Sequence, residues 1–266
     1  MKTEKINNYE IMENLFTTFR IGLLTARTGE VREHLTSLGF NYNQMDIGFN
    51  SGQFHHGKSE EFKQPFFDLG LLIETEGKGN APDRKPCKVF AKNSIVFPLR
   101  NEKDEMVNIY GYRFNLKEPT GEYLNDTGLY PMMPHKQTTR LYICLDVLST
   151  ASLVSSKVME NRDASLSLLD GKLNKATLSA IKGLNDLEEI ICVGCFTKEI
   201  KKELSKVFTG SILTINLTEG YSLNRLYAEY GSNAISQILE QDVREIEEAS
   251  LNELVVVSET EFEYKG

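Results

Sequence analysis

The chain has 266 residues and a formal net charge of −8, with 40% hydrophobic and 26% charged residues. This composition favours a folded protein of one large or two modest domains and excludes a disordered chain. The sequence has no apolar run of about 18 residues and no apolar signal-peptide core near its start. We therefore expect no membrane segment and a cytoplasmic location.

Charge is distributed unevenly along the sequence. Residues 241–266 contain eight acidic and two basic residues, a net −6, so the preceding 240 residues carry only −2. Residues 84–117 have a local excess of +5, with three acidic residues against eight basic ones. Such a strip is typical of a solvated surface or of a track for phosphates, and charge alone does not separate the two. The basic residues are Arg84, Lys85, Lys88, Lys92, Arg100, Lys103, Arg113 and Lys117.

Cysteine and histidine patterns give little support for a metal or redox site. Cys192 and Cys195 form a C-x-x-C pair, but no second pair has ligand spacing, and Cys192 belongs to an apolar strand pattern. In a cytoplasmic chain the four cysteines are expected to be free thiols. The adjacent His55 and His56 are interpreted as surface residues of a polar loop. The sequence predicts neither a metal site nor a cofactor.

Helical patterns dominate the first part of the chain. Residues 10–27 carry apolar residues at helical spacing, and "TGEVREHLTSLGF" predicts a second helix with Thr28 as its N-cap and Gly39 just past its end. A third helical piece is predicted around "EEFKQPFFDLGLLI", residues 60–73. The following polar loop, "ETEGKGNAPDRKP", is rich in glycine and proline.

A β hairpin is predicted next. "SIVFPLR", residues 94–100, and "MVNIYGYRF", residues 106–114, are strand patterns separated by the charged turn "NEKDE". Proline cannot donate a backbone hydrogen bond, so Pro98 is expected at an edge or beside a bulge.

From residue 140 onward, strand and helix patterns alternate. Strands are predicted at 140–144, 163–169, 188–194 and 211–217, with helices between them and closing helices from residue 222. This alternation predicts a parallel sheet with helices on both faces. The expected fold class is therefore α/β, with an α+β N-terminal subdomain at 1–135 and a parallel-sheet subdomain at 136–240. Residues 241–266 would form an acidic tail or a terminal strand, "ELVVVSETEFEYKG", able to pair with another chain.

In this order, the features resemble the RNA-polymerase core of bacterial DnaG-type primases, over about residues 12 to 240. "NSIVFPLRNEKDEMVNIYGYRF" is similar to the family's hairpin, R-x-x-FPIRD-x-x-G-x-V-x-GFGGR, and "EYLND" to its KYLNS. "RLYICLDVLSTASL" resembles the strand and helix that open the Toprim domain. "ILTINLTEGYSLNRLYAEYGSNAISQIL" resembles the segment that closes it.

The resemblance implies a Toprim site, which holds Mg²⁺ on carboxylates at strand ends beside reacting phosphates. The acids that the family uses are largely absent at the matching positions. For E-G-x-x-D the chain has Leu145, Asp146 and Ser149, for D-G-D it has Gly194, Cys195 and Phe196, and for D-P-D it has Ser222, Leu223 and Asn224. We therefore expect a degenerate Toprim domain without catalytic residues.

The resemblance also implies a nucleic-acid-binding surface. Arg100 and Arg113 stand where the family's basic residues face the template, and Lys103 lies in the turn between them. Tyr123 and Asn125 match the family's Y-L-N. In contrast, Glu122 replaces a lysine and Asn93 an arginine, and the family's preceding zinc module has no counterpart in this sequence.

Three functions remain open at this point. The first is an inactive primase-like protein that binds single-stranded DNA, in replication or mobile-element processing together with proteins of those systems. The second is a protein-interaction scaffold, favoured by the lost chemistry and the acidic tail. The third is an active Mg²⁺-dependent nucleotidyl transferase or nuclease that would rely on Asp146 and Glu219.

Overall fold

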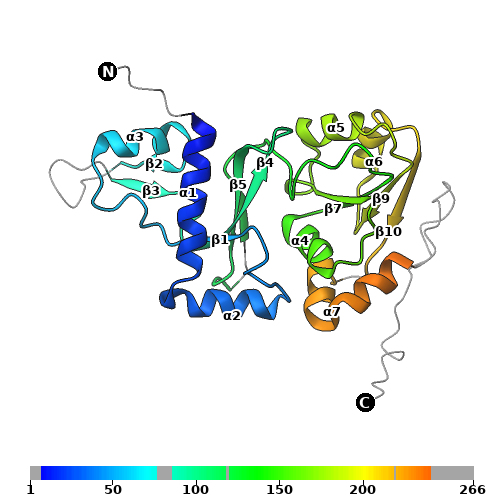
Figure 1. The fold of residues 1–266 in the computed structure, drawn as a ribbon, viewed down its shortest axis with the longest axis horizontal. Helices are drawn as coiled ribbons and strands as arrows, with labels where there is room; N and C mark the ends of the chain where they lie inside the picture. The colour runs from blue at the N-terminus through cyan, green and yellow to red at the C-terminus, as the bar shows by residue number, and fades with distance from the viewer. Residues whose placement is uncertain (1–6, 77–85, 118–119, 219, 241–266) are drawn as a thin grey trace, which may run out of the picture. The chain divides into compact units, whose positions relative to one another are not determined.

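The computed structural model describes residues 7–76, 86–117, 120–218 and 220–240. The chain folds into two compact units (Figure 1). Unit 1 comprises Met1–Met133 with Asn174–Ala176, and unit 2 comprises Pro134–Leu173 with Thr177–Gly266. None of the helices in these ranges combines the length and the apolar character needed to cross a membrane.

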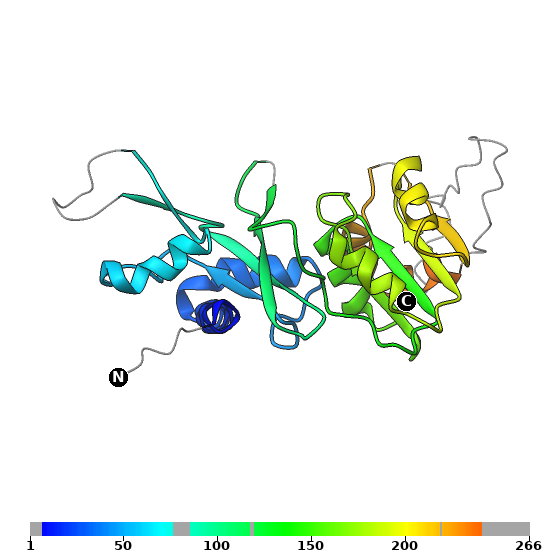
Figure 2. The same ribbon diagram turned by 90° about the horizontal axis from the view of Figure 1, so that it is seen from above.

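Unit 1 begins with the helices α1 (Asn8–Leu23) and α2 (Gly29–Ser37), joined by a short 3₁₀ turn, Ala26–Thr28. Apolar residues of α1 recur every three or four positions, so one face of the helix is buried. This face packs against strands of the neighbouring sheet, and Figure 2 shows the helix end-on beside it. Its buried residues are Met12, Leu15, Phe16, Phe19 and Leu23.

The junction before α2 departs from the sequence prediction. Thr28 occupies the predicted N-cap position, but its side chain makes no capping hydrogen bond. Its hydroxyl instead donates to the Leu23 carbonyl at 2.7 Å, where the end of α1 leaves acceptors free. Gly39 follows the end of α2 with a φ of 77°, as its predicted place past the helix end requires.

The main sheet of unit 1 is antiparallel and has the order β1-β4-β5-β6. Its strands are β1 (Gly48–Asn50), β4 (Ser94–Arg100), β5 (Met106–Arg113) and β6 (Thr120–Tyr123). The predicted hairpin is confirmed as β4 and β5. Strand β1 pairs with Ser94–Val96 only, so Pro98 lies where β4 has a partner on one side, next to a register shift at Leu99/Arg100.

A smaller sheet of β2 (Leu72–Glu74) and β3 (Cys87–Val89) lies alongside α3 (Glu60–Asp68), as Figure 2 shows. The sequence pattern placed residues 71–73 in the third helical piece, and this assignment is wrong. Gly70 adopts a φ of 76°, which ends the helix, and the chain then enters β2. The apolar run that follows is too short to show its period.

Unit 2 contains a four-stranded sheet of order β10-β9-β7-β8, in which every pair is parallel. The strands are β7 (Arg140–Cys144), β8 (Asp163–Ser167), β9 (Glu189–Val193) and β10 (Ser211–Ile215). Each strand is followed by a helical segment, because parallel neighbours need a crossover connection. The α/β fold class predicted from the sequence is confirmed.

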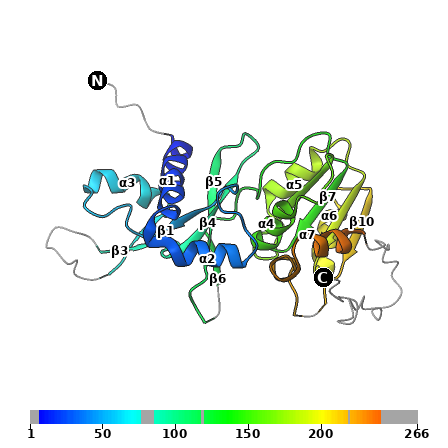
Figure 3. The ribbon, with the colours of Figure 1, turned by 60° about the horizontal axis from the view of Figure 1, so that its bottom comes forward.

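The described residues of unit 2 also form the helices α4 (Val147–Ser156), α6 (Lys198–Ser205), α7 (Leu223–Glu240) and most of α5 (Lys175–Lys182), whose first two residues belong to unit 1. Figure 1 shows α4 and α7 together on one side of the strands and α5 and α6 on the other. Helix α7 consists of two segments, visible in Figure 3, because Gly231 has non-helical angles. Residues of α4 and α7 share a core with alternate strand residues such as Tyr142, Ile191 and Leu213.

Candidate functional site

The junction between β7 and α4 stands where the resemblance places the first metal-binding acids. Asp146 is the N-cap of α4, and its Oδ1 accepts from the Ser149 backbone N–H at 2.8 Å. Its Oδ2 accepts from the Ser149 hydroxyl, also at 2.8 Å. Both carboxylate oxygens therefore satisfy donors of the helix end, the usual work of an aspartate N-cap. The pair organises the start of the helix.

The end of β9 is shaped by packing. Gly194 is buried with a φ of 113°, and a Cβ there would lie 3.0 Å from Cδ1 of Leu145. Its backbone N–H donates to the Ile215 carbonyl at 2.8 Å, which ties β9 to β10. The leucine at the tip of β7 thus lies against a glycine whose positive φ and close contact both disfavour a side chain. An apolar contact therefore occupies the point where the resemblance would place two carboxylates.

The start of α7 holds the third matching position. Asn224 is buried, and its Nδ2 donates to the Ser152 hydroxyl of α4 at 2.9 Å. Asn224 therefore holds α7 against α4. Buried polar groups need such partners, which explains an amide at this place.

These residues do not fit the Mg²⁺ that a Toprim site holds. Leucine and glycine offer no side-chain oxygen, and the Asp146 oxygens are engaged at the helix cap. Glu219, the other acid considered above, lies outside the described residues. Within the described ranges no three His, Cys, Asp or Glu side chains gather as a metal site would need.

The C-x-x-C pair is split between two environments. Cys192 is buried in β9, where burial raises the pKa of its thiol to about 12. Cys195 is exposed beyond the strand end. A buried thiol with a raised pKa forms little thiolate and is a poor nucleophile.

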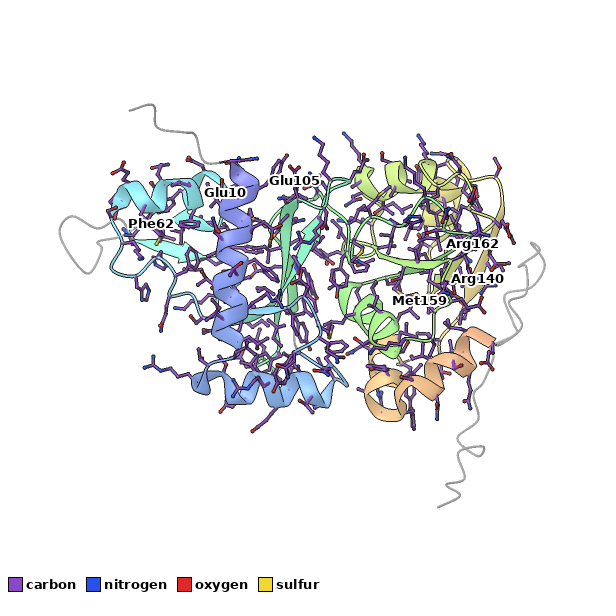
Figure 4. The ribbon with its side chains drawn as sticks, in the orientation of Figure 1. Glu10, Phe62, Glu105, Arg140, Met159 and Arg162 are labelled. Carbon is purple, nitrogen blue, oxygen red and sulfur yellow. The ribbon has the colours of Figure 1, made fainter. Side chains whose placement is uncertain are left out.

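A surface hollow of about 510 Å³ lies at the opposite, amino-terminal end of the parallel strands. Arg140 opens β7 and Asp163 opens β8, while Arg162 comes directly before β8; Figure 4 labels both arginines. The Arg140 guanidinium pairs with Glu189 at 3.0 Å, and Arg162 pairs with Asp186 at 3.3 Å. Ligands of open parallel sheets bind at the carboxyl ends of strands, so this hollow is not where a Toprim site would stand.

Arg100, a predicted nucleic-acid contact, is held within unit 1. Its Nη1 lies 2.6 Å from Glu13 Oε1, and its Nη2 lies 3.2 Å from Asp46 Oδ2. Nη1 also donates to the Asp104 carbonyl at 2.8 Å, and only 16% of the side chain is exposed. Glu13 and Asp46 lie far from Arg100 in sequence, so no local sequence pattern predicts these two contacts.

Arg113, at the end of β5, pairs with Glu122 of the adjacent strand β6 at 3.3 Å. The same Glu122 oxygen accepts from the Ala91 backbone N–H at 3.1 Å. The side chain of Arg113 is one-third exposed, and its Nε is buried without a hydrogen-bond partner in the described part of the chain. Glu122, at the position where the resemblance has a lysine, therefore engages Arg113.

Tyr123 is the last residue of β6, and Asn125 lies in the turn that follows it. The Tyr123 ring lies 4.7 Å from that of Tyr110, centroid to centroid. The Asn125 side chain donates to the Val107 carbonyl at 2.9 Å and accepts from the Thr127 backbone N–H. These contacts give both residues a structural role, and their contact with nucleic acid stays a prediction.

Lys103 differs from the other predicted contacts because it is exposed and forms no ion pair among the described residues. Its backbone N–H donates to Asn101 Oδ1 at 2.9 Å, which fixes the turn between β4 and β5. Figure 4 labels Glu105 in the same turn. Three further exposed lysines of the basic strip share this unpaired state: Lys88, Lys92 and Lys117. Arg84 and Lys85 lie outside the described residues.

No protein-family model matches the sequence, and no curated protein matches it either. Solved structures do match. The DnaG primase catalytic domain bound to single-stranded DNA has a TM-score of 0.67 and 16% identity, over 88% of this chain and 78% of that one. The E. coli primase catalytic core has a TM-score of 0.65 and 16% identity, over 88% and 80%.

A third match is the RNA-polymerase domain of Mycobacterium tuberculosis DnaG in complex with double-stranded DNA. It has a TM-score of 0.67 and 12% identity, over 88% of this chain and 80% of that one. These likenesses cover both units. The chain has the fold of the catalytic, RNA-polymerase core of DnaG-type primases.

Proposed function

We propose that this chain binds single-stranded DNA without synthesising primers, in DNA replication or in the processing of a mobile element. The observation that carries the proposal is the combination of a primase fold with a strand-end region devoted to packing and helix capping. Leu145 on Gly194, Asp146 on Ser149 and Asn224 on Ser152 all serve the fold. On this proposal the chain keeps the fold without the side chains for metal-assisted phosphoryl transfer.

Strand binding is supported by two observations. Primase domains of the same fold have been solved with single- and double-stranded DNA. In unit 1, Lys88, Lys92, Lys103 and Lys117 are exposed and form no ion pairs among the described residues. Each could neutralise a phosphate without first breaking an internal contact. Arg100 and Arg113 would have to leave acidic partners, so they are proposed as secondary contacts.

Fluorescence anisotropy with a single-stranded oligonucleotide at two salt concentrations tests the proposal. We expect binding that weakens steeply with salt, because bound phosphates release counterions. Replacing Lys88, Lys103 and Lys117 together by glutamine should lower the slope of log affinity against log salt by about 0.7 per lost contact. Lys182→Gln in α5 is the matched control. No binding at low salt would contradict the proposal.

A protein-interaction scaffold is the second candidate. The observation in its favour is the pairing of Arg100 with Glu13 and of Arg113 with Glu122, because it removes two cations from a possible phosphate track. A folded protein that fails to bind the oligonucleotide at low salt would favour this candidate.

A further inference from the structure

A cluster of four cationic or titratable side chains, which we name the histidine–lysine cluster, lies outside the predicted contacts. It consists of His55 and His56 from the loop between β1 and α3, Lys63 from α3, and Lys92 from the turn before β4. The two imidazole rings lie 4.6 Å apart, centroid to centroid. The Phe54 ring packs on His55 at 5.5 Å, which anchors the loop.

Asn50 holds the two segments of the cluster together. Its Nδ2 donates to the Phe90 backbone carbonyl at 2.8 Å, and its backbone carbonyl accepts from the Asn93 N–H at 2.7 Å. Its Oδ1 accepts from the Gly52 N–H at 2.8 Å. Asn50 is buried, so these bonds fix the loop before His55 against the turn that carries Lys92.

Lys92 crosses the histidine loop at Gly52. That glycine has a φ of 79°, and a Cβ there would lie 2.6 Å from Cγ of Lys92. The aliphatic stem of Lys92 therefore lies directly over the loop backbone, while the residue as a whole stays exposed. A side chain at position 52 would displace the stem.

The cluster carries more positive than negative charge. Lys63 is 8% exposed at its side chain and pairs with Glu60, whose carboxylate is half exposed, at 2.8 Å. Lys92 has no ion pair among the described residues. Lys58 adds a further cation, whose Nζ lies 5.1 Å from the centroid of the Phe62 ring. Glu122, which binds the Ala91 N–H, is engaged with Arg113.

His55 lies close enough to these cations for its pKa to be affected by them. Its Nδ1 is buried and has no hydrogen-bond partner in the described part of the chain. Burial lowers the pKa of His55, and the nearby His56, Lys63 and Lys92 lower it further. An anion beside these groups would offset the charge of the nearby cations and favour the protonated imidazole.

We propose that the histidine–lysine cluster binds a phosphate group of single-stranded nucleic acid. This inference rests on the proposed function, which already includes Lys92, and adds His55 and His56, which the sequence analysis interpreted only as surface residues of a polar loop. Phosphate oxygens would accept from Lys92 Nζ and from the protonated imidazoles, as charge-assisted hydrogen bonds. Because protonated histidine is needed, binding should take up protons and tighten as the pH falls from 7.5 to 6.

NMR titration of the histidine rings tests the site itself. The chain has four histidines, which single glutamine substitutions assign. Adding inorganic phosphate, and separately a short oligothymidylate, should shift the ring resonances of His55 and His56 and raise the pKa of His55. His34 and His135 serve as internal controls and should stay unchanged.

The outcomes separate this inference from the proposed function. Oligonucleotide binding without a shift at His55 or His56 would overturn the inference and keep the proposed function. A shift with inorganic phosphate alone would overturn assignment of the site to a strand. No oligonucleotide binding at all would overturn both. Equal shifts at all four histidines would mean general ion effects and would also overturn the inference.

The variant Lys92→Gln gives a second test of the histidine–lysine cluster. Lys92 is exposed, so its replacement should leave the fold intact. We expect oligonucleotide affinity at low salt to fall several-fold and the salt slope to fall by about 0.7. Lys182→Gln should change neither. Unaltered affinity and slope in folded Lys92→Gln would count against the site.

Discussion

At the scale of single residues, the arginines show how tertiary partners decide a role. Arg100 was predicted to face a nucleic-acid strand because it stands where the basic residues of DnaG-type primases face the template. In the fold, burial lowers the pKa of its guanidinium, but hydrogen bonds to Glu13 and Asp46 outweigh this, so the pKa is raised overall. The charged form is thus stabilised by α1 and by the segment before β1.

Arg100→Ala should therefore destabilise unit 1. Only the arginine of this ion network is mostly buried, while Glu13 and Asp46 are 40% and 43% exposed, so we expect a loss of about 1 to 2 kcal/mol in the free energy of unfolding. Lys103→Ala, in the same turn but exposed, should change it by less than about 0.5 kcal/mol. Urea denaturation of both variants measures the difference. Equal, small effects would mean that Arg100 is free to serve another role.

His34 should make the stability pH-dependent. Its ring is stacked on Phe114 at 4.5 Å, and burial lowers its pKa below 6.5. As the pH falls, His34 therefore becomes protonated in the unfolded chain before it does in the folded protein. The contribution of the neutral ring to the free energy of unfolding is present above about pH 6.5 and is lost as the pH falls towards the folded pKa. We compare urea unfolding of the wild type and of His34→Gln at pH 7.5 and 5.5. The wild type should lose more stability between the two; equal losses would contradict the assignment.

At the scale of elements, the sequence predicted most strands and helices correctly, because their periodicity is local. The hairpin of β4 and β5 follows from alternating residues around a charged turn, and the parallel sheet follows from the alternation after residue 140. The end of α3 was missed because Gly70 breaks an apolar run too short to show its period. Contacts such as Arg100 with Glu13 or Asn224 with Ser152 join residues far apart in sequence, and no local pattern encodes them.

The start of α4 carries a prediction that separates helix capping from metal binding. Asp146→Ala removes both bonds to Ser149 and should lower the free energy of unfolding by about 1 kcal/mol. Asp146→Asn keeps an acceptor for the Ser149 N–H and should cost less. Thermal unfolding of both variants, with and without millimolar Mg²⁺, is the measurement. A Mg²⁺-induced rise in Tm of the wild type that both variants lose would instead identify Asp146 as a ligand.

At the scale of the whole molecule, net charge opposes the proposed strand binding. The chain carries −8, of which residues 241–266 supply −6. A strand approaching the exposed lysines of unit 1 therefore meets a protein that is negative overall. Long-range repulsion of this kind slows association and is screened by salt.

Truncation after residue 240 should therefore tighten oligonucleotide binding, because the protein becomes less negative and its net charge changes from −8 to −2. We expect a several-fold gain at low salt that shrinks above about 0.1 M, where the screening length is about 10 Å. A full-length variant in which six of the eight acidic residues in this segment are replaced by their amides also has a net charge of −2 and should reproduce the gain. Anisotropy titrations of the three proteins at matched salt decide between two causes. If only the truncation tightens binding, the segment hinders the strand by occupying space; if neither variant does, local contacts alone set the affinity.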